Sequence, residues 1–171
     1  GAIGSETSGS ILSPSSQNSV VGLKPTVGLI SRSGIVPISS TLDTAGPITK
    51  NVTDNAILMD AAFGEDETDD KSFMIMWDIG FYVSELAAES LKGKRFGAPK
   101  QLMEDSLFVG AVKDLKVLGA EIIEIDEVEV GLPNFLNLLN MDMKRDLPKY
   151  MTTYANDSIS LRTVADMVGF N

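Results

Sequence analysis

Cysteine and histidine are both absent from the 171-residue sequence. Without cysteine the chain has no disulfide framework and no thiolate nucleophile, which fits a reducing compartment. Without histidine it cannot by itself assemble a Ser-His-Asp or Cys-His site, and it lacks the usual ligands of transition metals. We therefore expect neither a metal nor a cofactor, and any activated serine must lose its proton to another base.

Positive charge is also scarce, since 14 lysines and arginines stand against 24 aspartates and glutamates, for a net charge of −10. No cluster of basic residues would favour nucleic acid phosphates or anionic membranes. No apolar run reaches the ~18 residues that a membrane span needs, and no basic-then-apolar segment resembles a signal peptide. The composition predicts a cytoplasmic protein with no nucleic acid and no membrane partner.

Residues 1–50 are rich in glycine, serine, threonine and proline and carry only five charged side chains. Short apolar runs at 19–23, 27–31 and 34–38 interrupt the polar residues. A flexible linker would lack such runs, so the pattern favours an ordered, loop-rich segment with short strands.

The next stretch, 51–64, has the pattern of a helix, with Thr53 or Asp54 as its N-cap and Gly64 just beyond its end. The acidic residues at 64–70 predict a solvated surface loop. A calcium-binding EF-hand loop is disfavoured, because it would need glycine where Lys71 stands.

Three further segments have less specific sequence patterns. The apolar stretch 72–82, which contains the only tryptophan, is compatible with a buried strand or a docking surface. Residues 82–93 predict a helix that stops at glycine. The last third, 132–171, predicts helices whose methionine and leucine stripes indicate core packing.

The clearest pattern lies between residues 94 and 126. A strand at 94–99 is followed by a helix that Asp105 caps and Gly119 ends, and then by a strand at 120–126. Strand–helix–strand with short connections predicts a right-handed unit with parallel strands. The helix stripe expected to face inward is Leu107, Phe108, Ala111, Val112, Leu115 and Leu118.

The first 14 residues, GAIGSETSGSILSP, allow three interpretations. A phosphate-binding P-loop would need lysine after the last glycine-serine pair, but Ile11 follows Ser10. A plain cluster of turns is the second. The third is a nucleophilic Ser10 at a tight bend, where backbone N–H groups face a developing oxyanion and glycine lets the substrate approach closely.

Four motifs follow one another in the first third of the chain: G-[ST]-[DE]-T-x-G-S-I at 4–11, V-G-L-K-P-T at 21–26, S-R-x-G at 31–34 and L-D-x-x-G-P at 42–47. In this order they resemble the amidase signature family of serine hydrolases. Glu6 and the serine-rich SPSS at 13–16 look most like the peptide-amidase-like branch. The likeness is sharp over 4–64 and weaker through the rest of the chain.

The resemblance implies a Ser–cis-Ser–Lys triad with Ser10 as the nucleophile. It implies hydrolysis of a carboxylic amide C–N bond, on a non-peptide or C-terminal amide, through an acyl-serine intermediate. The backbone N–H groups that match the family's oxyanion hole are those of Thr7, Ser8, Gly9 and Ser10.

The family's lysine and cis-serine precede the nucleophile motif, so neither is present in this chain. We therefore expect a fragment of a longer enzyme that has no turnover alone. Lys24 belongs to the V-G-L-K-P-T motif and, like Arg32 and Asp43, is expected to order the loops. Ser8 and Leu12 depart from the glycine and arginine of many relatives, which affects the expected substrate class more than the reaction type.

The expected fold is α/β: an α/β/α layered amidase-signature fold with a mixed, largely parallel sheet flanked by helices. We expect one partial domain, with the signature region at 1–64 and further layers at 65–171. The expected substrate is a small-molecule or peptide amide, and a homodimer or a partner protein is compatible. Two alternatives stay open, the glutamine-hydrolysing component of an amidotransferase and a non-catalytic scaffold that retains the fold.

Overall fold

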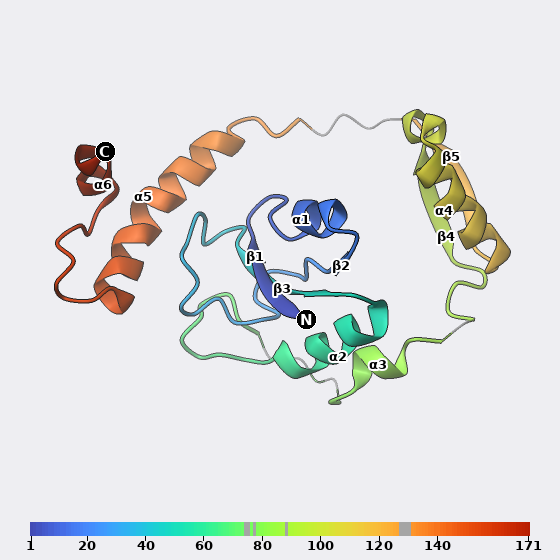
Figure 1. Ribbon diagram of the computed structural model, residues 1–171, viewed down its shortest axis with the longest axis horizontal. Coiled ribbons are helices and arrows are strands. Elements are labelled where there is room, and N and C mark those ends of the chain that lie inside the picture. Colours follow the sequence, from blue (N-terminus) through green and yellow to red (C-terminus); the bar gives the residue numbers. More distant parts are fainter. Residues whose placement is uncertain (74–75, 77, 88, 127–130) are drawn as a thin grey trace. The chain divides into compact units, whose positions relative to one another are not determined.

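The computed structural model describes residues 1–73, 76, 78–87, 89–126 and 131–171. Its contacts divide the chain into two compact units, each considered by itself below. Figure 1 shows the helices and strands of both. The first unit is Gly1–Val83 with Pro133–Asn171, and the second is Ser84–Leu132.

The first unit contains a three-stranded sheet in the order β1-β3-β2, and both pairings are antiparallel. Ala2 lies opposite Ile48 and Glu6 lies opposite Thr44, so the first strand ends at Glu6, where the serine-rich loop begins. The central strand is buried along most of its length. The strands are β1 (Ala2–Glu6), β2 (Val21–Gly22) and β3 (Thr44–Thr49).

Neither β1 nor β3 was predicted, because both are short and β3 carries Gly46 and Pro47, which are typical of turns. The strands predicted within 27–31 and 34–38 are wrong, since these residues form turns and irregular loops. Their apolar side chains enter the core from loops. That core contains Leu29, Ile30, Ala45 and Met59.

The helix α2 (Val52–Ala62) packs against β3 and confirms the helix predicted here. Its cap is Asn51 rather than Thr53 or Asp54, because the Asn51 side-chain oxygen accepts the Asp54 N–H at 2.8 Å. The other helices of this unit are α1 (Leu12–Gln17), α5 (Phe135–Tyr154) and α6 (Val164–Phe170). The short α3 (Phe81–Ser84) spans the boundary between the two units in the sequence. The helical last third is therefore confirmed.

The second unit confirms the predicted strand–helix–strand pattern. Its two strands are parallel, from Arg95 opposite Glu121 to Pro99 opposite Ile125. The Asp105 carboxylate caps the helix by accepting the N–H groups of Leu107 and Phe108. The elements are β4 (Arg95–Pro99), the 3₁₀ helix η1 (Lys100–Glu104), α4 (Ser106–Val117) and β5 (Glu121–Ile125).

The predicted inward stripe of α4 is too wide. Val112 is buried and Phe108 and Leu115 are half-buried, whereas Leu107 is 84% exposed. The helix predicted at 82–93 is also wrong in extent, since it ends at Ser84 and the described residues from 85 to 93 form turns and irregular structure. The interpretation of the stretch 72–82 falls partly on residues 74, 75 and 77, which lie outside the described residues.

These elements confirm the α/β class. The expected parallel pairing is that of β4 with β5, and the sheet of the first unit is antiparallel. Among the residues that the structure describes, no helix has both the length and the apolar character needed to cross a membrane. The single partial domain stays a prediction.

Candidate active site

Ser10 lies in the short loop between the end of β1 and the start of α1 (Figure 1). It is exposed, and Gly9 before it has a φ of +96°, in the left-handed region that strains any other residue. The Ser13 N–H donates to the Gly9 carbonyl at 2.8 Å and closes the bend. The serine hydroxyl is therefore presented at a sharp turn on the surface of the first unit.

Glu6 holds the residues that follow Ser10. This residue is only 4% exposed, and its Oε2 atom accepts the N–H groups of Ile11 at 2.8 Å and Leu12 at 3.0 Å. Burial raises the pKa of Glu6, but hydrogen bonds from the N–H groups of Leu12, Gly9 and Ile11 outweigh it and lower the pKa below its ordinary value. The buried carboxylate is thus charged at neutral pH and clamps the loop.

Lys24 contributes to this clamp through its charge, which also lowers the pKa of Glu6. Its side chain is half-buried and forms no ion pair with any described residue. The structural role of Lys24 stays a prediction.

Asp43 holds the residues that precede Ser10. The Thr7 hydroxyl donates to Oδ1 of Asp43, while Oδ2 accepts the N–H groups of Ile38 at 2.9 Å and Ser39 at 2.8 Å. Asp43 is buried. It therefore orders two loops at once, which confirms its predicted structural role.

The predicted oxyanion-hole residues lie between these two carboxylates. The Gly9 N–H is directed to the Glu6 carboxylate and contributes to its lowered pKa. No acceptor among the described residues takes a hydrogen bond from the Ser8 or Ser10 N–H. These two amides are therefore available to an oxyanion formed at Ser10, and the assignment of the full stretch stays a prediction.

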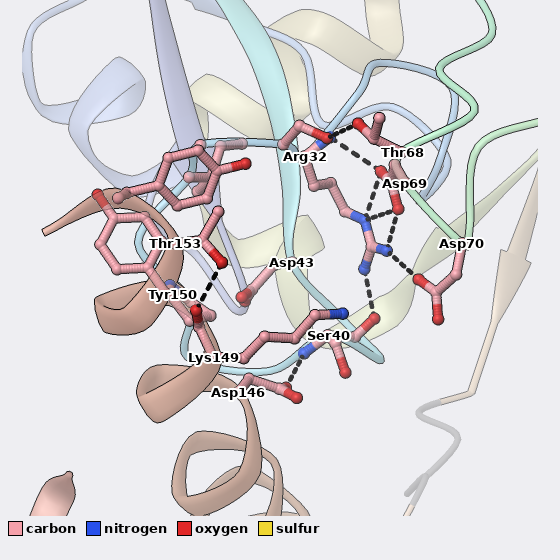
Figure 2. Close-up of a pocket in the computed structure, with 15 residues that line it drawn as sticks. Arg32, Ser40, Asp43, Thr68, Asp69, Asp70, Asp146, Lys149, Tyr150 and Thr153 are labelled. Carbon is pink, nitrogen blue, oxygen red and sulfur yellow. Dashed lines mark hydrogen bonds and ion pairs between the residues drawn. The ribbon is translucent and has the colours of Figure 1, made fainter. Parts of the chain in front are cut away.

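Asp43 also lines a pocket of about 310 Å³ (Figure 2). Ser10 does not line it. Its walls come from the loop 32–43, from the acidic stretch and from the last turns of α5. Labelled lining residues include Arg32, Ser40, Asp43, Asp69, Lys149 and Tyr150.

The acidic stretch is a mostly exposed loop, as predicted, but Asp69 within it is buried. The Asp69 side chain is 3% exposed and receives the Arg32 guanidinium, with Nε to Oδ2 at 2.9 Å. Arg32 also donates to the Ser40 carbonyl and to Asp70. The ion pair joins residues 37 positions apart, which no local pattern could indicate, and it confirms the structural role of Arg32. In the described part of the chain, no group of three acidic side chains could hold a metal ion.

The lowered pKa of Asp69 predicts a pH-dependent contribution to stability. Burial raises this pKa, but hydrogen bonds from the Arg32 side chain and from the N–H groups of Lys71 and Arg32 lower it from 3.8 to about 2. The stabilisation is therefore complete above about pH 4 and is lost as the pH falls through about 2. Asp69→Asn is expected to lower the free energy of unfolding by about 2 kcal/mol at neutral pH and by less in acid.

Urea unfolding of both proteins at about pH 7 and about pH 3 measures this difference. Asp70→Asn is the matched control, because Asp70 contacts the same arginine but its side chain is 82% exposed. It should change stability by less than about 0.5 kcal/mol. An equal loss for Asp69→Asn at both pH values would contradict the assigned pKa.

Sequence reasoning missed a second acidic pair, Asp142 and Asp146 on α5. Asp142 is buried and accepts the Ser39 hydroxyl at 2.5 Å, and Asp146 accepts the Ser40 N–H at 2.9 Å. Figure 2 shows the second of these bonds at the edge of the pocket. The available signal was their i,i+4 spacing, which places two carboxylates on one helix face.

The comparisons with known proteins bear on the whole of this site. The Amidase family model matches residues 1–169. The chain belongs to the amidase family. The predicted amidase-signature resemblance and fold are therefore confirmed.

Several solved amidases are similar in sequence and structure. The chain is 37% identical to the native peptide amidase of Stenotrophomonas maltophilia, with a TM-score of 0.85 over 99% of this chain and 36% of that one. It is 33% identical to an amidase family protein of Bacillus anthracis, with a TM-score of 0.87 over 99% and 34%. The likeness to peptide amidase agrees with the predicted branch.

Curated relatives include both enzyme classes that the sequence left open. The chain is 37% identical to a probable amidase of Arabidopsis thaliana, over 99% of this chain and 34% of the relative. It is 40% identical to the A-type subunit of the glutamyl-tRNA(Gln) amidotransferase of Thermoanaerobacter pseudethanolicus, over 87% and 32%. The chain thus spans about a third of the length of the relatives it matches.

Proposed function

We propose that this chain carries the nucleophile of an amidase, with Ser10 as the acyl-accepting residue. The observation that carries the proposal is the exposed hydroxyl of Ser10 at the Gly9 bend, held from one side by Glu6 and from the other by Asp43. A serine so fixed can attack the same carbonyl carbon in the same direction at every turnover.

The reaction proceeds in two halves. The Ser10 hydroxyl loses its proton to a base and its Oγ bonds to the amide carbonyl carbon, whose oxygen takes the negative charge. The N–H groups of Ser8 and Ser10 stabilise that charge. The C–N bond then breaks, the leaving nitrogen takes the proton, and water releases the carboxylic acid from the acyl-serine.

The base comes from outside these 171 residues. The chain has no histidine, and we assign Lys24 a structural role, since its charge lowers the pKa of Glu6. In the family that the motifs indicate, a lysine acting through a cis-serine fills this role, and both precede the nucleophile motif. We accordingly propose that the chain alone has no amidase turnover.

The relatives support two candidate substrate classes. The similarity to peptide amidase supports a non-peptide or C-terminal amide as the substrate, and the absence of cysteine supports the cytoplasm as the compartment. The 40% identity to the amidotransferase component supports a second candidate, glutamine hydrolysis with a partner protein that receives the ammonia.

A chimera tests the function. Residues 1–171 replace the aligned 36% of the Stenotrophomonas maltophilia peptide amidase, which then supplies the rest of the enzyme. We expect ammonia release from a peptide amide by this chimera and none by the chain alone. Release from glutamine alone would favour the second candidate. Turnover by the isolated chain would contradict the external base.

A further inference from the structure

The loop that holds Thr7 is itself held by helix α5. The Asp142 carboxylate accepts the Ser39 hydroxyl at 2.5 Å and the Arg145 guanidinium at 2.8 Å. One turn further along the helix, Asp146 accepts the Ser40 N–H at 2.9 Å. Two consecutive residues of the loop are thus fixed by partners 103 and 106 positions away in the sequence.

This contact continues to the nucleophile loop. Ser39 donates its hydroxyl to Asp142 and its N–H to Asp43, and Asp43 accepts the Thr7 hydroxyl. Thr7 precedes the nucleophile by three residues, so its Cα lies within about 11 Å of that of Ser10. A chain of hydrogen bonds therefore runs from the middle of α5 to the loop that carries Ser10.

Three members of this chain are buried, and Thr7 at its end is half-buried. Ser39 is 0% exposed, Asp142 is 3% exposed and Asp43 is 6% exposed. Among the described residues, no buried side-chain nitrogen or oxygen lacks a partner. Removing one member leaves its neighbour with a buried, unsatisfied polar group, so the neighbour must move to find another partner.

Resting on the proposed function, we propose that Asp142 is a positioning residue for Ser10. It does not touch the reacting atoms. It fixes Ser39, which aligns Asp43, which in turn fixes Thr7 and the direction from which the nucleophile loop presents its hydroxyl. Catalysis at Ser10 therefore depends on a carboxylate on a helix far downstream in the chain.

In the chimera, Asp142→Ala is expected to lower kcat for amide hydrolysis by about 10- to 100-fold and to leave KM within about twofold. Asp142→Asn keeps an oxygen that can accept the Ser39 hydroxyl, so it should recover most of the lost kcat. Asp114→Ala on α4, an exposed helical aspartate in the second unit, is the matched control and should change neither constant.

Hydrogen exchange on the intact 171-residue chain gives a readout independent of activity. Asp142→Ala should accelerate exchange of the amides of Ile11 and Leu12 at least ~10-fold. A purely local role would change only the loop 38–43. If Asp142→Ala unfolds the chain, the same exchange experiment is carried out on Ser39→Ala, which removes only one hydroxyl. The expected acceleration of exchange at Ile11 and Leu12 is the same.

Unchanged exchange at Ile11 and Leu12 together with unchanged kcat would overturn the inference. The proposed function fails separately, if a chimera with Ser10→Ala keeps its activity. In that case the exchange result still decides whether α5 fixes the loop. Equal loss of kcat in Asp142→Asn and Asp142→Ala would contradict the role of the Ser39 hydrogen bond.

Discussion

Replacing Ser10 with alanine is expected to abolish amide hydrolysis by the chimera, with kcat lower by about 10⁶ or below detection. In the proposed reaction the Ser10 hydroxyl oxygen becomes acylated, and no neighbouring cysteine or histidine can replace it, since the chain contains neither. Ammonia release from a peptide amide measures the loss.

Ser13→Ala is the matched control for this experiment. Ser13 lies three residues further along the same segment, is exposed, and contributes to the bend through its backbone N–H, which alanine retains. The control should keep activity within about twofold, as surface substitutions usually do. Activity retained by the Ser10 variant would show that the nucleophile lies elsewhere and would reject the site.

Removing the carboxylate of Glu6 is expected to cost about 3 kcal/mol in the free energy of unfolding. The Ile11 and Leu12 N–H groups both bond to Oε2 of Glu6, and a substitution to alanine removes that acceptor from both, although Ile11 is fully buried. Glu6→Gln, which keeps one oxygen acceptor, should lose less. Urea unfolding of the 171-residue chain compares the two variants.

Glu67→Ala is the control for this comparison, because Glu67 is exposed and makes no hydrogen bond with the described residues. It should alter stability by less than about 0.5 kcal/mol. A loss for Glu6→Ala no larger than that of the control would mean that the loop is not held by this carboxylate.

Local sequence patterns were sufficient for parts of the fold. The strand–helix–strand segment of the second unit was predicted because its helix has an Asp105 cap, a glycine stop at Gly119 and flanking apolar strands, all encoded by near neighbours. The loop position of Ser10 was likewise predicted, from the ordered motifs around it. Such features depend on residues a few positions apart.

The features that were missed depend on distant partners. Strand β3 was not predicted, because Pro47 is unusual in a central strand. In the folded chain β3 lies between β1 and β2, which pair with it on both sides. The local sequence indicates only a surface charge at Asp69, because its ion-pair partner Arg32 lies far away in the sequence. Asp142 carried no local sign that Ser39 would be its partner.

The same contrast applies to the candidate site. The motif indicated Ser10 as the nucleophile, and Asp43 was expected to order the loops, but the partners of the holding carboxylates could not be predicted, because they combine three segments of the chain. Glu6 lies within the motif, Asp43 lies in a later loop and Asp142 lies on a helix far downstream. Their roles follow from hydrogen bonds that only the folded chain brings together.

The most direct test of the account is labelling with a fluorophosphonate, which phosphonylates activated serines. The chimera is treated with the probe, and the modified residue is located by peptide mass spectrometry. The account predicts one adduct, on Ser10, and none when the isolated chain is treated under the same conditions. An adduct on another serine of these 171 residues, or an active chimera with Ser10 unmodified, would contradict it.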